Sequence, residues 1–191
     1  MDTKANIQPQ TSSSKTKSMV IIALMAAVTC ILGPLSLAIP ISPVPISLTN
    51  LAVYFTVYVL DRKRGTISYL LYLLIGFAGV PVFSAFTGGP GKLFGPTGGY
   101  LIGFIFMAYI CGFFIDKWPS KLYMHFIGMI LGTAVCYLFG TVWLAYQAEM
   151  GFYAALGAGV IPFIPGDLVK IIIALIAGPV IRKQLRRAGL N

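Results

Sequence analysis

Residues 161–187 read IPFIPGDLVKIIIALIAGPVIRKQLRR, a long apolar run that ends in a cluster of basic residues. Between residues 161 and 181 it carries only two charged side chains, Asp167 and Lys170. A helix of this length can cross the hydrocarbon core of a membrane, for which about 20 residues are needed. The basic cluster that follows is typical of the cytoplasmic end of such a helix. This stretch therefore predicts a membrane-spanning helix.

The rest of the chain has the same apolar character. Of its 191 residues 58% are hydrophobic and only 10% are charged, and the mean hydropathy is +0.87. Soluble domains carry roughly 25% charged residues, and a soluble protein of this size could not bury so much apolar surface. The composition excludes a soluble domain and predicts an all-α integral membrane protein, which we expect in the plasma membrane.

Five further apolar segments precede this one, so the sequence predicts six transmembrane helices. The predicted spans are residues 19–32, 46–60, 66–86, 100–115, 122–147 and 161–181. Residues 1–18 are polar and predict a disordered cytoplasmic tail. Residues 19–191 are then expected to form a single six-helix transmembrane domain.

The distribution of basic residues predicts the orientation in the membrane. With the amino terminus inside, every Lys and Arg except Lys92 and Lys170 falls on the inner side. Cytoplasmic segments carry such an excess, so both termini are predicted to be cytoplasmic. These charges account for the formal net charge of +9 and would lie beside anionic membrane lipid. A nucleic-acid partner is not expected, because the basic residues are split among separate segments.

Three elaborate connections then fall on the outer side. Residues 33–45 contain four prolines, which exclude a regular helix, and are predicted to form a structured apolar cap. Residues 87–99, TGGPGKLFGPTGG, form a glycine-rich loop, and residues 151–159 a small, flexible connection. Function tends to lie on irregular segments that a rigid scaffold holds, so we expect a site on this side.

The two charged residues of the last span are the first candidates for ligand binding. Asp167 and Lys170 are three positions apart, which places them on one helical face, in the outer half of the span. Charges at such depth are costly and are usually functional. An acceptor-only carboxylate beside a three-donor ammonium suits a neutral polar ring with both N–H and C=O groups. The alternative is a structural ion pair that only fixes this helix.

Other outer residues complete the predicted ligand-binding set. Asn50 can donate and accept at once, although an interhelical hydrogen bond is the alternative. Lys92 could attract an anionic tail at the pocket mouth, or be only an interfacial lysine. The aromatic candidates, each a pocket wall or an interfacial anchor, are Phe94, Tyr100 and Trp143.

Catalysis, metal binding and cofactors are not expected. The sequence contains no HExxH or GxSxG motif, and it lacks paired carboxylates at one depth. Its single histidine and three cysteines have no metal-ligand spacing. The chain is therefore predicted not to be an enzyme. Since it contains no nucleotide-hydrolysing domain, uphill transport would need partner subunits.

Two motifs resemble those of a known family. GPTGGYLIGF at residues 95–104 and PGDLVK at residues 165–170 look like the BioY family, the biotin-specific substrate-binding (S) components of energy-coupling-factor (ECF) transporters. The resemblance covers nearly the whole chain beyond the polar tail. It implies the six-helix S-component fold, with the first loop over an outward-facing pocket, and biotin as the ligand.

The resemblance also implies roles for individual residues. Asp167 and Lys170 match the polar motif of the sixth helix and would hold the ureido ring of biotin. Ala23 and Ala27 match an AxxxA pattern that docks the transmembrane coupling subunit, and two ATPase subunits would complete the module. The implied function is capture of biotin for ATP-driven import. An S component for another vitamin and an energy-independent channel or facilitator for a small solute are the alternatives.

Overall fold

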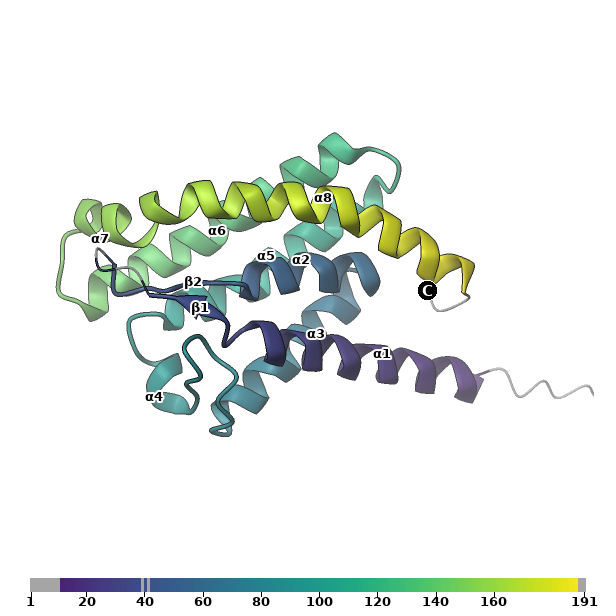
Figure 1. Cartoon of the computed structure of the whole chain (residues 1–191), viewed down its shortest axis with the longest axis horizontal. Coiled ribbons are helices and arrows are strands. Elements are labelled where there is room, and N and C mark those ends of the chain that lie inside the picture. Colours follow the sequence, from purple (N-terminus) through teal and green to yellow (C-terminus); the bar gives the residue numbers. More distant parts are fainter. Residues whose placement is uncertain (1–10, 39, 41, 189–191) are drawn as a thin grey trace, which may run out of the picture.

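The computed structural model describes residues 11–188 except 39 and 41, and its long helices lie along the longest axis of the molecule (Figure 1). These helices are α1 (Thr11–Leu32), α2 (Thr49–Val59), α3 (Arg62–Phe77), α5 (Gly98–Lys117), α6 (Leu122–Gln147) and α8 (Ile164–Arg187). The short elements are β1 (Ser36–Leu37), β2 (Ile46–Ser47), α4 (Pro90–Leu93), α7 (Phe152–Gly159) and the 3-10 turn η1 (Ile161–Phe163). The fold is therefore mostly helical, as the sequence predicts.

Among the described residues, four helical segments are long and apolar enough to cross a membrane. They are residues 15–32, 98–117, 122–147 and 152–187. The helix α2 is apolar but only 11 residues long, and α3 has 16 residues. A chain with several such helices and so few charges is a multi-pass membrane protein.

The third predicted span, residues 66–86, is wrong at its carboxyl end, because α3 ends at Phe77. Gly79 follows with a φ of +101°, a conformation that glycine adopts without steric cost. The backbone N–H of Gly79 donates to the Gly76 carbonyl, and that of Val80 donates to the Ile75 carbonyl. This pair of bonds is the Schellman arrangement that ends many helices.

Two segments expected to be irregular are helical instead. The helix α1 begins at Thr11, so the predicted disordered tail is wrong over residues 11–18, and residues 1–10 lie outside the described part of the chain. A helix already nucleated by an apolar run extends readily through Lys and Ser. The predicted flexible connection at residues 151–159 forms α7, where Ala154, Ala155 and Leu156 favour a helix.

The proline-rich cap contains a short antiparallel pairing rather than a helix. Ser36 pairs with Ser47 and Leu37 with Ile46, so β1 and β2 form a two-stranded ribbon. The second predicted span therefore starts too early, since residues 46–47 belong to β2 and α2 begins at Thr49. This ribbon brings the backbone of Ser47 close to the start of α8, which matters for the site.

The centre of the molecule is the pair α5 and α6, which pack along much of their length. A Cβ added at Gly103 would lie 2.9 Å from the Cα of Cys136, so glycine is required for this close approach. Fully buried aromatic residues of α2 and α3, including Tyr54, Tyr58 and Tyr72, pack into the same core.

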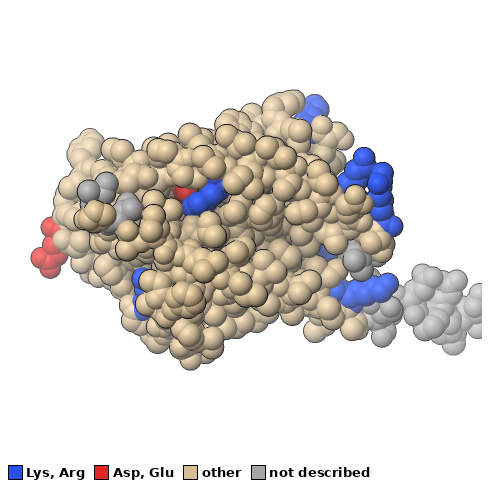
Figure 2. All heavy atoms as spheres, in the orientation of Figure 1, with Lys and Arg blue, Asp and Glu red and all other residues tan. Residues whose placement is uncertain are grey.

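The two ends of the molecule differ in charge. The start of α1 and the end of α8 lie at the same end, and the β1–β2 ribbon, α4 and α7 lie toward the other (Figure 1). Figure 2 shows most of the visible Lys and Arg side chains at the end where α8 terminates. We call this the basic end.

Candidate ligand-binding site

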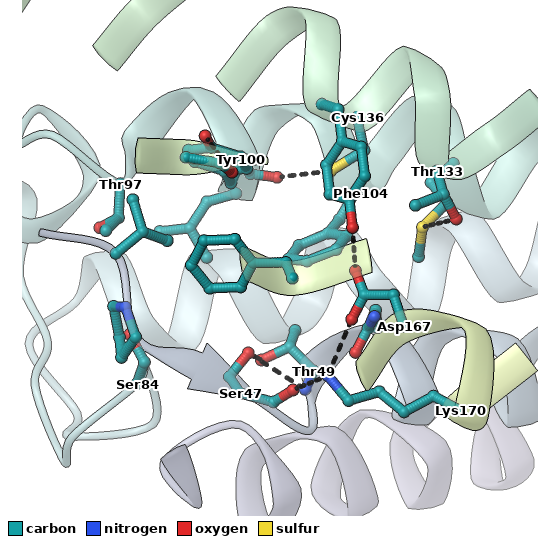
Figure 3. A pocket seen from close by; sticks show the side chains of 18 residues that line it. Ser47, Thr49, Ser84, Thr97, Tyr100, Phe104, Thr133, Cys136, Asp167 and Lys170 are labelled. Carbon is teal, nitrogen blue, oxygen red and sulfur yellow. Dashed lines mark hydrogen bonds and ion pairs between the residues drawn. The ribbon is translucent and has the colours of Figure 1, made fainter. Parts of the chain in front are cut away.

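A cavity opens between β2, the start of α2, α5, α6 and the start of α8 (Figure 3). It measures about 660 Å³ including its open mouth. Tyr100, Phe104, Met107 and Phe163 supply apolar walls, and the polar lining comes mainly from hydroxyl side chains and one ion pair. A mostly apolar hollow with a few placed polar groups is the usual form of a small-molecule site.

The ion pair consists of Asp167 and Lys170, both in the first turns of α8. The Lys170 Nζ lies 3.0 Å from Asp167 Oδ1, and each residue is 8% exposed. Pro165 is tolerated because α8 begins at Ile164, where the proline removes no intrahelical hydrogen bond. An aspartate in the first turn also lies near the positive end of the helix dipole. The local sequence therefore both starts the helix and aims the pair at the cavity.

The remaining bonding capacity of the pair is partly filled by two other elements. The Tyr137 hydroxyl on α6 donates to Asp167 Oδ2 at 2.6 Å, and Lys170 Nζ donates to the Ser47 carbonyl of β2 at 2.6 Å (Figure 3). A buried ion pair is costly unless additional hydrogen bonds satisfy its members. Here both charges are held in place, and the pair as a whole is neutral.

Two further predicted residues line the same cavity. Asn50, at the start of α2, is 4% exposed, and its Oδ1 accepts a hydrogen bond from the Leu51 backbone at 3.1 Å. Tyr100, at the start of α5, donates its hydroxyl to the Gly159 carbonyl at 2.8 Å. This bond fixes the end of α7 over the cavity. The structure thus brings four predicted residues together: Asn50, Tyr100, Asp167 and Lys170.

The other three predicted residues are not among those that line the cavity. Phe94 is 60% exposed. Trp143 Nε1 donates to the Gly95 carbonyl at 2.9 Å, so the indole holds the glycine-rich loop. Lys92 is half-buried in α4, where burial lowers the pKa of its ammonium. Lys92 and Phe94 belong to the turn of α4 and its end, and Trp143 lies on α6. None of the three side chains lines the cavity, although the sequence places all three near it.

Several lining residues were missed by the sequence analysis. Tyr137, Ser84 and Thr97 are unremarkable in the sequence, and only packing brings them to the cavity. Thr97 is 7% exposed, and its hydroxyl has no hydrogen-bond partner among residues 11–188 as described. Figure 3 places Thr97 and Ser84 across the cavity from Asp167 and Lys170. The cavity therefore has an ion pair at one side and hydroxyl groups at the other.

A packed layer separates this cavity from the basic end. Asn50, Tyr54 and Tyr58 follow one another at four-residue spacing on α2, which places them on one helical face. Tyr54, between the other two, is fully buried, and its hydroxyl lies 2.6 Å from Thr133 Oγ1 on α6. On the side toward the basic end, the cavity is therefore closed by Tyr54 and its hydrogen bond to Thr133, which we call the aromatic layer.

The helix α1 presents a second predicted surface. Ala23 and Ala27 are both exposed, on a segment of which only 17% is buried inside the molecule. Large apolar side chains on the same helix, such as Leu24 and Ile31, are exposed as well. Small residues at four-residue spacing allow another helix to approach closely within a membrane.

The amino-acid sequence matches one protein family and several of its members. The family model described as the BioY family matches residues 3–187. The chain is 38% identical over 166 residues to the biotin transporter BioY2 of Lactococcus lactis subsp. cremoris, a match that covers 87% of this chain and 90% of that protein. It is 37% identical over 138 residues to the biotin transporter BioY of Thermotoga maritima, with 72% and 80% covered.

A solved structure is similar over nearly the full chain. The crystal structure of the S-component for biotin from an ECF-type ABC transporter superposes with a TM-score of 0.84 at 32% identity. The match covers 91% of this chain and 95% of that one. With its sequence matched almost from end to end and its fold shared with an S-component, this chain belongs to the BioY family.

Proposed function

We propose that this chain is the biotin-binding subunit of a vitamin uptake transporter of the plasma membrane. The proposal is carried by one observation: a neutral, buried pair of Asp167 and Lys170 lines the cavity of a BioY-family chain. The named relatives are biotin transporters. The ureido ring of biotin has two N–H donors and one carbonyl, which match a carboxylate beside an ammonium.

We place the ureido ring against the ion pair, where it can reach both charged groups. Asp167 would accept from a ring N–H, and Lys170 would donate to the ring carbonyl. Tyr137 and the Ser47 carbonyl, which bond the pair at 2.6 Å each, would hold both groups in position before the ligand arrives. The walls formed by Tyr100 and Phe104 would contact the apolar part of the bicycle, and Asn50 would add a polar contact.

The carboxylate tail would then extend toward the opposite side of the cavity. Thr97 and Ser84 lie there and offer hydroxyl donors. Trp143 and Phe94 would act indirectly, through the loop that carries Thr97, because the Trp143 indole and the Gln147 amide bond to the carbonyls of Gly95 and Phe94. Lys92 would act only as a positive charge near the mouth.

The membrane arrangement completes the proposal. We assign the six spans to α1, α2, α3, α5, α6 and α8, which make residues 19–191 one transmembrane domain with both termini cytoplasmic. The collection of basic side chains at one end supports this orientation. The cavity would then face outward, and the chain would act as a transporter subunit without catalysis and without a cofactor.

The partners would be those of an ECF module: a transmembrane coupling subunit and two ATPase subunits. The solved structure that this chain resembles is the S-component of an ECF-type ABC transporter. Exposed Ala23 and Ala27 offer the docking surface.

Ala23→Leu with Ala27→Leu should abolish assembly and uptake in cells while leaving biotin binding by the isolated chain unchanged. Ala154→Leu, a change at an exposed alanine of α7, is the matched control, and a loss of uptake there as well would contradict this docking surface.

The decisive experiment is a calorimetric titration of the purified chain in detergent with biotin, with thiamine and riboflavin in parallel. We expect saturable one-to-one binding of biotin alone. Binding of another vitamin in its place would assign a different S-component specificity. A folded sample that binds none of the three would refute the proposal.

A further inference from the structure

A second cavity lies at the basic end, on the far side of the aromatic layer. It measures about 880 Å³ including its open mouth, and it is formed by the end of α2, the start of α6 and the last turns of α8. Four basic side chains line it: Arg182, Lys183, Arg186 and Arg187. Within the described part of the chain, no acidic side chain lines it.

Arg182 is the deepest of these basic groups and is only partly paired. Its Nη2 lies 2.6 Å from Asp116 Oδ1, and its side chain is 12% exposed. Its Nε and Nη1 are buried and have no acceptor among the residues that the structure describes. A buried donor without a partner is costly, and more so when it is charged. Asp116 is already engaged further, because its Oδ2 accepts from the Arg62 backbone at 2.9 Å.

The other wall of the cavity cannot supply the missing acceptor. His125 Nε2 lies 3.0 Å from the Trp118 carbonyl, which can only accept, so this nitrogen carries the proton. His125 Nδ1 lies 3.0 Å from the Tyr58 hydroxyl. Both nitrogens of the imidazole are therefore engaged, and neither offers an acceptor to Arg182. The cavity therefore combines a surplus of positive charge with a guanidinium that is only partly paired.

We propose that this cavity binds a phosphate group. A guanidinium N–H donates a strong, charge-assisted hydrogen bond to a phosphate oxygen. Arg182 has two donors without an acceptor among the described residues, Nε and Nη1, which point to different sides of the group and would each make a single bond. Lys183, Arg186 and Arg187 surround them with positive charge. Basic pockets between transmembrane helices on the cytoplasmic side hold anionic lipid headgroups, so a phospholipid of the inner leaflet is one source and a free phosphate ion is the other.

The test measures the thermal unfolding midpoint of the full chain in detergent with added ligands. The probes are short-chain phosphatidylglycerol, short-chain phosphatidylcholine and inorganic phosphate. We expect phosphatidylglycerol to raise the unfolding midpoint. The wild-type chain should need a roughly tenfold lower lipid concentration than Arg182→Gln for the same rise, a ratio that corresponds to the loss of one charged contact. Because Arg182→Gln also removes the bond to Asp116, the exposed pair Lys183→Gln with Arg186→Gln serves as a second variant and should lose most of the protection.

The control is Lys63→Gln with Lys121→Gln, which removes the same charge from exposed positions that do not line the cavity. Protection retained in this control and lost in the cavity variants supports the proposal. Equal protection by inorganic phosphate would identify the free ion as the ligand, and protection by phosphatidylglycerol alone would identify the lipid. Absence of any shift, or equal loss in the control, would overturn the proposal. Biotin titrations of the same variants keep this result separate from the proposed function.

Discussion

The helix α8 carries one ion pair near each end, and the two pairs differ in how completely they are satisfied. At its start, Lys170 bonds to Asp167 and to the Ser47 carbonyl, and Asp167 also accepts from Tyr137. Toward its end, Arg182 bonds to Asp116 while two of its nitrogens stay without an acceptor among the described residues. The first pair is neutral, and both of its members have further hydrogen-bond partners, whereas the second leaves positive charge available.

This difference indicates two kinds of ligand. A balanced pair of donor and acceptor groups favours a neutral ring that can hydrogen-bond to both charges, because neither charge needs an ionic partner. A guanidinium that is only half paired, among other basic groups, favours an anion. The same helix therefore contributes to two binding sites, one for a neutral ring and one for an anion, and the aromatic layer with Tyr54 lies between them.

The largest effect should follow from breaking the outer pair. Lys170→Met leaves Asp167 buried without its cation, and removal of one partner from a buried pair costs about 3–5 kcal/mol of stability. The double change Asp167→Asn with Lys170→Met should recover most of this stability but not biotin binding. Thermal unfolding and calorimetry measure the two quantities. A double variant that binds biotin like the wild type would reduce the pair to a structural role.

Variants on the carboxylate side of the outer pair sharpen the same comparison. We expect Asp167→Asn to reduce biotin affinity by about 1.5–3 kcal/mol, the contribution of a hydrogen bond to a charged group. Tyr137→Phe removes the hydroxyl that bonds to Asp167 Oδ2 and should give a smaller loss, since the ligand contact itself remains. Calorimetry on both variants would show this order, and an unchanged affinity for Asp167→Asn would speak against direct contact.

At the inner pair, Asp116→Asn should lower stability without changing biotin affinity. The change removes a charged partner from Arg182 and weakens the bond to the Arg62 backbone, for which we expect a loss of about 1–3 kcal/mol. Biotin affinity should not change, because the packed layer lies between the two sites. A large change in affinity would mean that the two ends of α8 are coupled.

The smallest effect is expected from Lys92, which is not among the lining residues. A partly exposed charge contributes about 0.2–1 kcal/mol to an ionic interaction, so Lys92→Ala should only narrow the preference for biotin over its carboxamide. Parallel titrations with the two ligands measure this ratio. If both affinities equal those of the wild type, Lys92 has no part in recognition.

Local patterns in the sequence were sufficient for some of these features. Composition predicts the membrane environment, and the prolines of residues 33–45 exclude a helix there, as the described residues of that segment confirm. The three-residue spacing of Asp167 and Lys170 places both on one face of a helix wherever that helix lies. These features depend only on residues close together in the chain, so they follow from the sequence alone.

The packing of distant segments fixed the hydrogen-bond partners of these charges. The bond from Tyr137 to Asp167 joins residues 30 positions apart, and that from Lys170 to the Ser47 carbonyl spans 123 positions. No sequence period or motif encodes hydrogen bonds between residues so far apart in the chain, because these bonds form only when α6, β2 and α8 pack together. The same holds for the unpaired nitrogens of Arg182, whose surroundings come from three helices. The spacing of residues along the chain determines which charges share a helical face. The packing of the helices determines which of these charges find hydrogen-bond partners.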